Sequence, residues 1–240
     1  MSEIKHSQDV RSFFDQTDLY LCRNIGLLFR KEIIQYFLGT VSGQRILDVG
    51  CGDGSLSIHF LATGNQLTLM DVSPNMLALA RQKIPSSLVE SATFLQEDFL
   101  ELKDKGAFDI VLCIGVLAHV SNVELAINKI SDILAPGGRC VLQFTDQEHF
   151  VGKWAYWTYL VQRKFQASYP YPINSLRGTL LRKMVFESNL QILGERCYWT
   201  MPPGAGKLPL GWVEKMLRIL NNFPHSSRLG GEKMWLLAKP

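Results

Sequence analysis

Short apolar runs alternate with amphipathic stretches along the first 150 residues of the chain. Four runs, RILDV (45–49), QLTLMDV (66–72), ATFLQED (92–98) and FDIVLCIGV (108–116), have the length and composition of buried parallel strands. RCVLQFTD (139–146) repeats the pattern. Strands that alternate with helices at this spacing form βαβ units. The sequence therefore predicts an α/β fold, a mostly parallel sheet with helices on both faces.

Three stretches between the predicted strands have the spacing and the boundaries of helices. We expect one helix over 55–63 and a second over 74–84, which Ser73 caps at its N-terminus. The third is expected over 122–134, and the sequence Pro-Gly-Gly at 136–138 separates it from the next strand.

The sequence ILDVGCGDGS places Gly50, Gly52 and Gly54 directly after the first predicted strand. One interpretation is that these glycines only form the turn into the next helix. The other is that a nucleotide-type cofactor lies against bare backbone at a helix N-terminus, at the carboxyl end of a strand where such sheets bind ligands. Position 55 is Ser and the loop has no lysine, so neither a dinucleotide fingerprint nor a phosphate loop is present.

Asp48, Asp71 and Asp98 stand at the ends of three successive predicted strands. Asp71 follows the glycine loop by about twenty residues, where a carboxylate can accept both hydroxyls of a ribose. Asp98 is placed to meet the amino group of an adenine. The alternative for either residue is a helix N-cap or a solvated loop end. Acids and glycines without a fixed cation favour a neutral or cationic adenosine ligand over a pyrophosphate.

Together, ILDVGCGDGS, LMDVSPNML, the ED of QED, FDIVLCIGVLAHV and LAPGG resemble the class I S-adenosylmethionine-dependent methyltransferases in order and spacing. The resemblance covers residues 44–146. It implies a Rossmann-like sheet of seven strands with the seventh antiparallel, for which 189–199 and 232–240 are the candidates for strands six and seven. It also implies S-adenosylmethionine as cofactor, S-adenosylhomocysteine as product, and no metal.

The resemblance assigns roles to matching residues. The backbone of 50–52 would lie against the methionine part of the cofactor, with Asp48 supporting the loop and the Ile114 carbonyl at the methionine amino group. Asp71 would hold the ribose hydroxyls. Around the adenine the resemblance implies Val72, Met76, Asp98 and Phe99. The full set of implied cofactor residues is Asp48, Gly50, Cys51, Gly52, Gly54, Asp71, Val72, Met76, Asp98, Phe99 and Ile114.

We expect one domain over 1–240, with 44–146 as its cofactor-binding core. Of the other segments, 1–43 is expected to supply lid helices, and 147–188 and 200–231 to cap the substrate side, because the parallel strands direct their carboxyl ends to one face. The second segment is unusually aromatic, which favours an apolar acceptor. The candidates for the acceptor pocket are Trp154, Tyr156, Tyr159, Tyr169, Trp199 and Trp212.

The aromatic stripe of the second segment has other interpretations. Its residues recur at helical spacing, which is typical of a helix face packed on the core. Three cations border the stripe, so contact with a membrane surface is a further alternative. The stripe comprises Phe150, Trp154, Trp157 and Val161, and the cations are Lys153, Arg163 and Lys164.

Methyl transfer is an in-line attack on an activated sulfonium methyl group, so the protein mainly orients the reactants and excludes water. A general base is needed only where the acceptor arrives protonated. His119 after strand four and His149 after strand five are the candidates. The alternatives are a hydrogen-bonded turn residue for His119 and a surface loop residue for His149. His6, His59 and His225 have no such placement.

Composition narrows the class of protein. The chain has 240 residues, 47% apolar and 20% charged, with a net charge of +3 and scattered basic residues, so nucleic-acid binding has no support. The five cysteines form no CxxC pair, which disfavours a disulfide framework, a redox motif and a zinc site. The polar start MSEIKHSQDV is not a signal peptide, and we expect a cytoplasmic protein. It would be a monomer or a homodimer, with the amphipathic stretch 210–220 as packing helix or dimer contact.

The function expected from these features is methyl transfer to an oxygen, nitrogen or carbon of a small hydrophobic or aromatic acceptor, in specialised-metabolite or quinone-like biosynthesis. One alternative is a non-methylating, cyclase-like catalyst on the same fold that uses the cofactor structurally. Another is a non-enzymatic partner protein that keeps the cofactor site.

Overall fold

A computed structural model of the chain describes residues 3–15, 25–103, 107–149, 176–199, 209–222 and 230–240, together with residues 153, 157, 160, 171, 173 and 174. Its centre is a seven-stranded sheet in the order β3-β2-β1-β4-β5-β7-β6. The strands are β1 (Arg45–Val49), β2 (Gln66–Met70), β3 (Ala92–Leu95), β4 (Phe108–Cys113), β5 (Leu134–Thr145), β6 (Gln191–Tyr198) and β7 (Glu232–Ala238).

Strands β1 to β5 pair in parallel, whereas β7 runs antiparallel to both of its neighbours, β5 and β6. The predicted fold class is thereby confirmed, including the antiparallel seventh strand. The chain order reverses at β1, which lies between β2 and β4. In such sheets the crevice for a ligand opens at this reversal, beyond the carboxyl ends of the strands.

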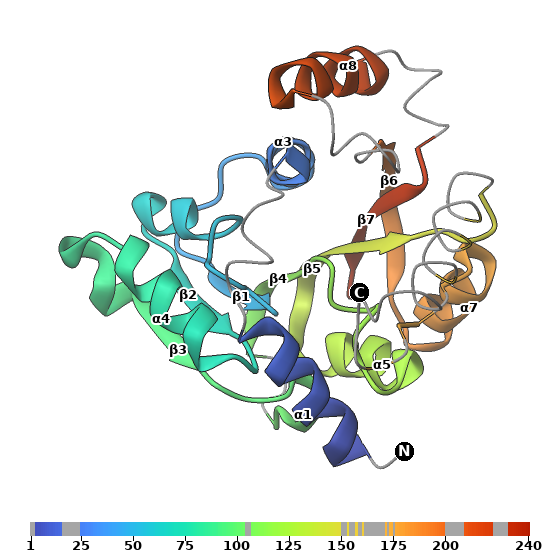
Figure 1. Cartoon of the computed structure of the whole chain (residues 1–240). Helices are drawn as coiled ribbons and strands as arrows, with labels where there is room; N and C mark the ends of the chain where they lie inside the picture. Colours follow the sequence, from blue (N-terminus) through green and yellow to red (C-terminus); the bar gives the residue numbers. More distant parts are fainter. Residues whose placement is uncertain are drawn as a thin grey trace.

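Helices cover both faces of the sheet (Figure 1). One face packs against α5 and α7 and the other against α3, η1 and α8, so the molecule has two apolar cores. The α-helices are α1 (Glu3–Phe14), α3 (Ile25–Leu38), α4 (Pro74–Lys83), α5 (Val123–Ile133), α7 (Gly178–Glu187) and α8 (Leu210–Asn222). The 3₁₀ helices are η1 (Ile58–Thr63), η2 (Ser86–Ser91) and η3 (Phe99–Glu101).

Local sequence explains where two of the helices begin. The Ser73 hydroxyl accepts a hydrogen bond from the Met76 N–H, and Pro74 fills the first helical position of α4. The Asn122 side chain caps α5 through the Leu125 N–H. Helix α5 buries Ala126, Ile127, Ile130 and Ile133. Each of the three isoleucine side chains contributes about 1.5–3 kcal/mol relative to exposure.

The helix predicted over 55–63 is wrong in its first part. Residues 55–57 form turns, and the 3₁₀ helix η1 covers only Ile58–Thr63. The Ser57 hydroxyl donates to Asp48 Oδ2 at 2.5 Å, so it does not cap a helix. Gly64 ends the element in the left-handed conformation (φ 74°), at the predicted position.

The predicted break at Pro-Gly-Gly is also wrong. Strand β5 begins at Leu134, directly after α5, and runs through these residues. The register against β4 shifts between Phe108 and Ile110, which accommodates the extra residues as a bulge. Pro136 has no N–H to give to a ladder, and Gly137 has a φ of 74°. A bulge therefore satisfies the pattern that suggested a loop.

Candidate functional site

A cavity lies beyond the carboxyl ends of β1, β2 and β4, and α1 crosses over it (Figure 1). It offers about 830 Å³ of space, including its open mouth. Its walls come from the glycine loop, the ends of β2, β3 and β4, and one face of α1.

The glycine loop has a backbone that glycine alone adopts readily. Gly50, Gly52 and Gly54 have φ values of 60°, 54° and 70°. Conformation therefore accounts for all three glycines, as the turn interpretation expects. Gly50 and Gly52 also line the cavity, whereas Gly54 does not, and a Cβ at Gly54 would lie 2.6 Å from the Ile58 side chain.

Asp71 joins the glycine loop to the start of α4. Its Oδ2 accepts from the Gly52 N–H and its Oδ1 from the Ser73 N–H, both at 2.9 Å. Burial raises the pKa of the Asp71 carboxyl, and the two backbone donors oppose that rise. Each carboxylate oxygen still has a lone pair for a ligand hydroxyl, because each accepts about two hydrogen bonds.

The cavity is lined by three carboxyl groups, Asp71, Glu97 and Asp98, and none of its described lining residues is Lys or Arg. Such a site attracts a cationic or hydroxyl-bearing ligand and repels a phosphate. Asp98 also caps η3 through the Leu100 N–H at 3.0 Å, which confirms the N-cap alternative, and its contact with an adenine stays a prediction. Sequence reasoning missed Glu97, because it assigned one acid to each strand end.

Of the eleven predicted cofactor residues, eight line the cavity. These eight are Gly50, Gly52, Asp71, Val72, Met76, Asp98, Phe99 and Ile114. Asp48, Cys51 and Gly54 are not among the lining residues. The structure thus brings most of the predicted set together, and their roles toward a cofactor remain predictions.

Asp48 and Cys51 are buried, and burial raises the pKa of both side chains. Burial raises the pKa of Asp48 to about 7, although its bond from Ser57 acts in the other direction. The Cys51 thiol donates to the Gly52 carbonyl at 3.4 Å, and burial raises its pKa well above the usual value. A thiol held neutral in this way is not an activated nucleophile.

Helix α1 supplies the remaining wall. His6, Val10 and Phe14 line the cavity at intervals of four residues, one face of a helix, and Ser7 joins them. The expectation that His6 has no placement at the site is wrong, because His6 Nε2 lies 2.8 Å from the His119 carbonyl oxygen. The spacing of these three residues was visible in the sequence.

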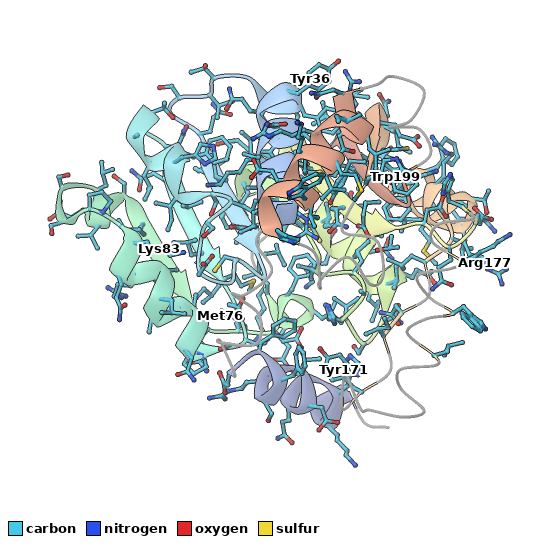
Figure 2. All side chains as sticks on the ribbon, turned by 45° about the horizontal axis from the view of Figure 1, so that its top comes forward. Tyr36, Met76, Lys83, Tyr171, Arg177 and Trp199 are labelled. Atoms are coloured by element: carbon cyan, nitrogen blue, oxygen red, sulfur yellow. The ribbon has the colours of Figure 1, made fainter. Side chains whose placement is uncertain are left out.

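His119 lines the cavity opposite α1. Its Nδ1 lies 3.1 Å from the hydroxyl of Tyr171, a buried residue beside α1 in Figure 2. Burial, with a smaller effect from His6, lowers the pKa of His119 to about 4, so its ring is neutral at pH 7. The backbone N–H of His119 donates to the Val116 carbonyl at 2.8 Å. His119 is therefore both a turn residue and a cavity residue.

His149 is placed differently. It is not among the described residues that line the cavity. The backbone N–H of His149 donates to the Asp146 carbonyl at 3.3 Å, and burial lowers the pKa of its half-buried ring. This position matches the loop alternative better than the catalytic one.

Two of the predicted acceptor-pocket aromatics lie away from the cavity. Trp212 is 76% exposed on α8, because α8 buries Val213 and Leu217 against the core that α3 shares. Trp199 packs on that core, with its N–H donating to Asn221 of α8, and lies far from Met76 and Tyr171 in Figure 2. The other four candidates, Trp154, Tyr156, Tyr159 and Tyr169, are outside the described residues.

Of the aromatic stripe, the structure describes one residue, Trp157. Its side chain is 61% exposed, and the other three members fall outside the described ranges.

Among the residues that the structure describes, no group of three or more His, Cys, Asp or Glu is arranged to hold a metal ion. No helix within that same part of the chain combines the length and apolar character required to cross a bilayer.

The sheet order, the glycine loop and the acidic cavity define a Rossmann-like protein with a nucleoside-type binding site at the reversal of strand order. Residues 47–142 match the family described as a methyltransferase domain. Over the strands β1 to β5 the chain is therefore similar to a methyltransferase domain.

Two curated methyltransferases are similar to part of the chain. It is 31% identical over 156 residues to a demethylmenaquinone methyltransferase of Tropheryma whipplei (strain Twist), covering 61% of this chain and 64% of that one. It is 35% identical over 103 residues to a ubiquinone biosynthesis O-methyltransferase of Xanthomonas euvesicatoria pv. vesicatoria (strain 85-10), covering 42% and 43%. The match thus spans less than two thirds of each curated relative.

A solved structure shares the fold across the chain. It is the magnesium protoporphyrin IX methyltransferase of Synechocystis PCC 6803 with bound S-adenosylhomocysteine. The TM-score is 0.67 at 19% identity, over 98% of this chain and 100% of that one.

Proposed function

We propose that the protein transfers the methyl group of S-adenosylmethionine to an oxygen, nitrogen or carbon of a small hydrophobic or aromatic acceptor, with quinols as the first candidates. Both curated relatives carry quinone-pathway names, which supports that choice of acceptor. Specialised-metabolite biosynthesis is the broader setting. The apolar and aromatic residues of the cavity wall, among them Val10, Phe14, Val116 and Val120, suit such a molecule.

One observation carries the proposal: a bare glycine backbone and three carboxyl groups line the same cavity, without a lysine or arginine among the described lining residues. S-adenosylmethionine is a cation at its sulfonium and its ammonium and presents two ribose hydroxyls. Gly50 and Gly52 let the chain approach it closely, and Asp71 is placed for the hydroxyls. The residues present therefore fit this cofactor.

When bound, the cofactor supplies a methyl group already activated on sulfur. Attack of the acceptor atom on this carbon would release the sulfur as a neutral thioether, which would keep the electron pair of the S–CH₃ bond. The protein orients the two reactants in line and excludes water. We propose that α1 acts as a lid for this purpose, because four of its residues line the cavity.

An acceptor hydroxyl or amine must lose its proton during the transfer. We propose His119 as the group that takes it, because its neutral ring lines the cavity and the Tyr171 hydroxyl is bonded to its Nδ1. Its low pKa makes it a weak base, so it suits acceptors that are themselves acidic, such as phenols and quinols. His149 lies outside the cavity wall and is left out of this proposal.

The direct experiment incubates the protein with methyl-labelled S-adenosylmethionine and a panel of hydrophobic phenols, amines and quinols. Transfer of label to a product is the expected result. Tight cofactor binding without transfer to any acceptor would favour the cyclase-like or partner-protein alternative. His119→Ala is expected to lower kcat about 100-fold, with His149→Ala as the matched control near wild-type turnover.

A further inference from the structure

Gln143 is buried on β5, near the cavity end of the strand, at 3% exposure. Its Nε2 donates to Oε2 of Glu232, whose Oε1 accepts from the Thr145 hydroxyl at 2.7 Å. Gln143 Oε1 is buried and has no hydrogen-bond partner within the part of the chain that the structure describes. More than nine in ten buried polar groups are paired. This oxygen therefore lacks a hydrogen-bond donor, which the described residues do not supply.

The Glu232 carboxylate determines which way the Gln143 amide faces. A carboxylate accepts hydrogen bonds, so only the NH₂ end of the amide pairs with it favourably. The reversed amide would bring two acceptor oxygens together. Glu232 therefore holds Gln143 Oε1 on the side away from itself.

That side is the cavity end of β4. Cys113 pairs with Leu142 in the sheet, so Gln143 lies beside Ile114. Ile114 and Gly115 both line the cavity. A Cβ on Gly115 would lie 3.7 Å from Gln143 Oε1, and no other described atom beyond its chain neighbours comes within 4 Å of that position. The missing side chain of Gly115 thus leaves a methyl-sized space beside the unpaired oxygen.

We propose that Gln143 Oε1 accepts a hydrogen bond from the ammonium group of the cofactor's methionine part. This inference rests on the proposed cofactor. An ammonium has three donors and no acceptor, so it needs acceptors on more than one side. Resemblance already assigns it the carbonyl of Ile114, which directly follows the neighbouring strand β4. The Glu232 carboxylate behind the amide adds negative potential for a cation.

Gln143→Met tests the proposal, since it keeps the length of the side chain and removes the oxygen. Calorimetry would measure the Kd of two probes, S-adenosylhomocysteine and 5′-methylthioadenosine, which has the adenosine and the thioether but no ammonium. We expect the Kd of S-adenosylhomocysteine to rise about tenfold, the usual effect of losing a hydrogen bond to a charged group. The Kd of 5′-methylthioadenosine is expected to stay unchanged.

A second variant and a control sharpen the result. Glu232→Gln releases the orientation of the amide, and we expect the same selective loss of affinity from it. Thr145→Val removes the other bond to Glu232 without touching Gln143, and both Kd values are expected to stay within about twofold. The Gln143→Met result decides whether the oxygen binds ligand, and the Glu232→Gln result decides whether its orientation matters.

Unchanged affinity for S-adenosylhomocysteine in Gln143→Met overturns the proposal. An equal loss for both probes also overturns it, because Gln143 would then only support the fold. If the wild-type protein binds neither probe, the cofactor assignment fails together with this inference. That outcome is distinct from wild-type binding that the variant does not change.

Discussion

Asp71 serves both the fold and the site, because one carboxyl group holds two backbone N–H groups and still lines the cavity. Its bond to Gly52 fixes the glycine loop, and its bond to Ser73 fixes the entry of α4. The same side chain is proposed to bind the ribose. A single substitution there removes both contributions.

Asp71→Ala is expected to weaken S-adenosylhomocysteine binding by about 1–3 kcal/mol, the cost of leaving buried polar groups without a partner. Isothermal titration calorimetry measures it directly. Asp109→Asn is the control, since Asp109 bonds Arg45 near the start of β1, away from the cavity wall. Equal affinity of the Asp71 variant and the wild type would contradict the assignment.

Asp48 makes stability depend on pH, because its pKa is about 7 in the folded protein and about 3.9 in an unfolded chain. The folded state then binds more protons between these values. Its contribution to stability is therefore present below about pH 4 and lost as pH rises to about 7.

Asp48→Asn keeps a neutral group of the same shape and removes this dependence. We expect the unfolding free energy of the variant to exceed that of the wild type by an amount that grows from about pH 4 and levels off above pH 7 at about 2–4 kcal/mol. Urea unfolding across this range measures the difference. A constant difference between the two proteins at all pH values would show that Asp48 is ionised in the fold.

At the scale of elements, α1 is held over the cavity at both ends. Near its N-terminus His6 Nε2 contacts the His119 carbonyl oxygen at 2.8 Å, and after its C-terminus Asp15 accepts from the Ser73 hydroxyl at 2.6 Å. Phe14 and His119 meet edge to face with ring centroids 5.3 Å apart. The proposed lid must release these contacts before a ligand can leave the cavity.

Asp15→Ala is expected to speed the release of S-adenosylhomocysteine about five- to tenfold, because it removes the hydrogen bond between Ser73 and the Asp15 side chain at the C-terminal end of α1. Stopped-flow fluorescence measures the rate. Arg11→Ala provides the comparison, since its 3.9 Å ion pair with Asp15 is exposed and contributes little. Identical release rates for all three proteins would mean that α1 is not a lid.

Sequence predicted the elements that local pattern determines and failed where tertiary contacts decide. The five parallel strands and the cap at Ser73 follow from periodicity and capping chemistry. The bulge at Pro136 and Gly137 depends on the register against β4 and on a bond from the Gly137 N–H to the carbonyl of Lys239, about 100 residues later. Helix 55–63 failed because Ser57 bonds a buried acid. Trp212 was misplaced because composition does not tell which side of α8 meets the core.

At the scale of the whole molecule, residues that are far apart in the chain meet beyond the carboxyl ends of the parallel strands. The cavity draws residues from α1, the glycine loop, and the ends of β2, β3 and β4. The inferred Gln143 contact adds β5 and, through Glu232, β7. Ligand binding should therefore stabilise the fold as a unit rather than one segment of it.

At 100 times its Kd, a ligand that binds only the folded state stabilises it by about 2.7 kcal/mol. For a chain of this length the midpoint of thermal unfolding should then rise by about 5–10 °C. Calorimetric scans with S-adenosylhomocysteine at that ratio check the value, and inosine serves as the unrelated nucleoside. A rise with inosine of the same size would indicate an unspecific site.

A crystal structure of the protein with S-adenosylhomocysteine would show directly whether the cavity binds the cofactor. We expect the ribose hydroxyls at Asp71, the adenine between Val72, Met76 and Phe99, and the thioether against the backbone of Gly50 and Gly52. Ligand bound elsewhere, or a cavity that stays closed by side chains at saturating ligand, would contradict this expectation.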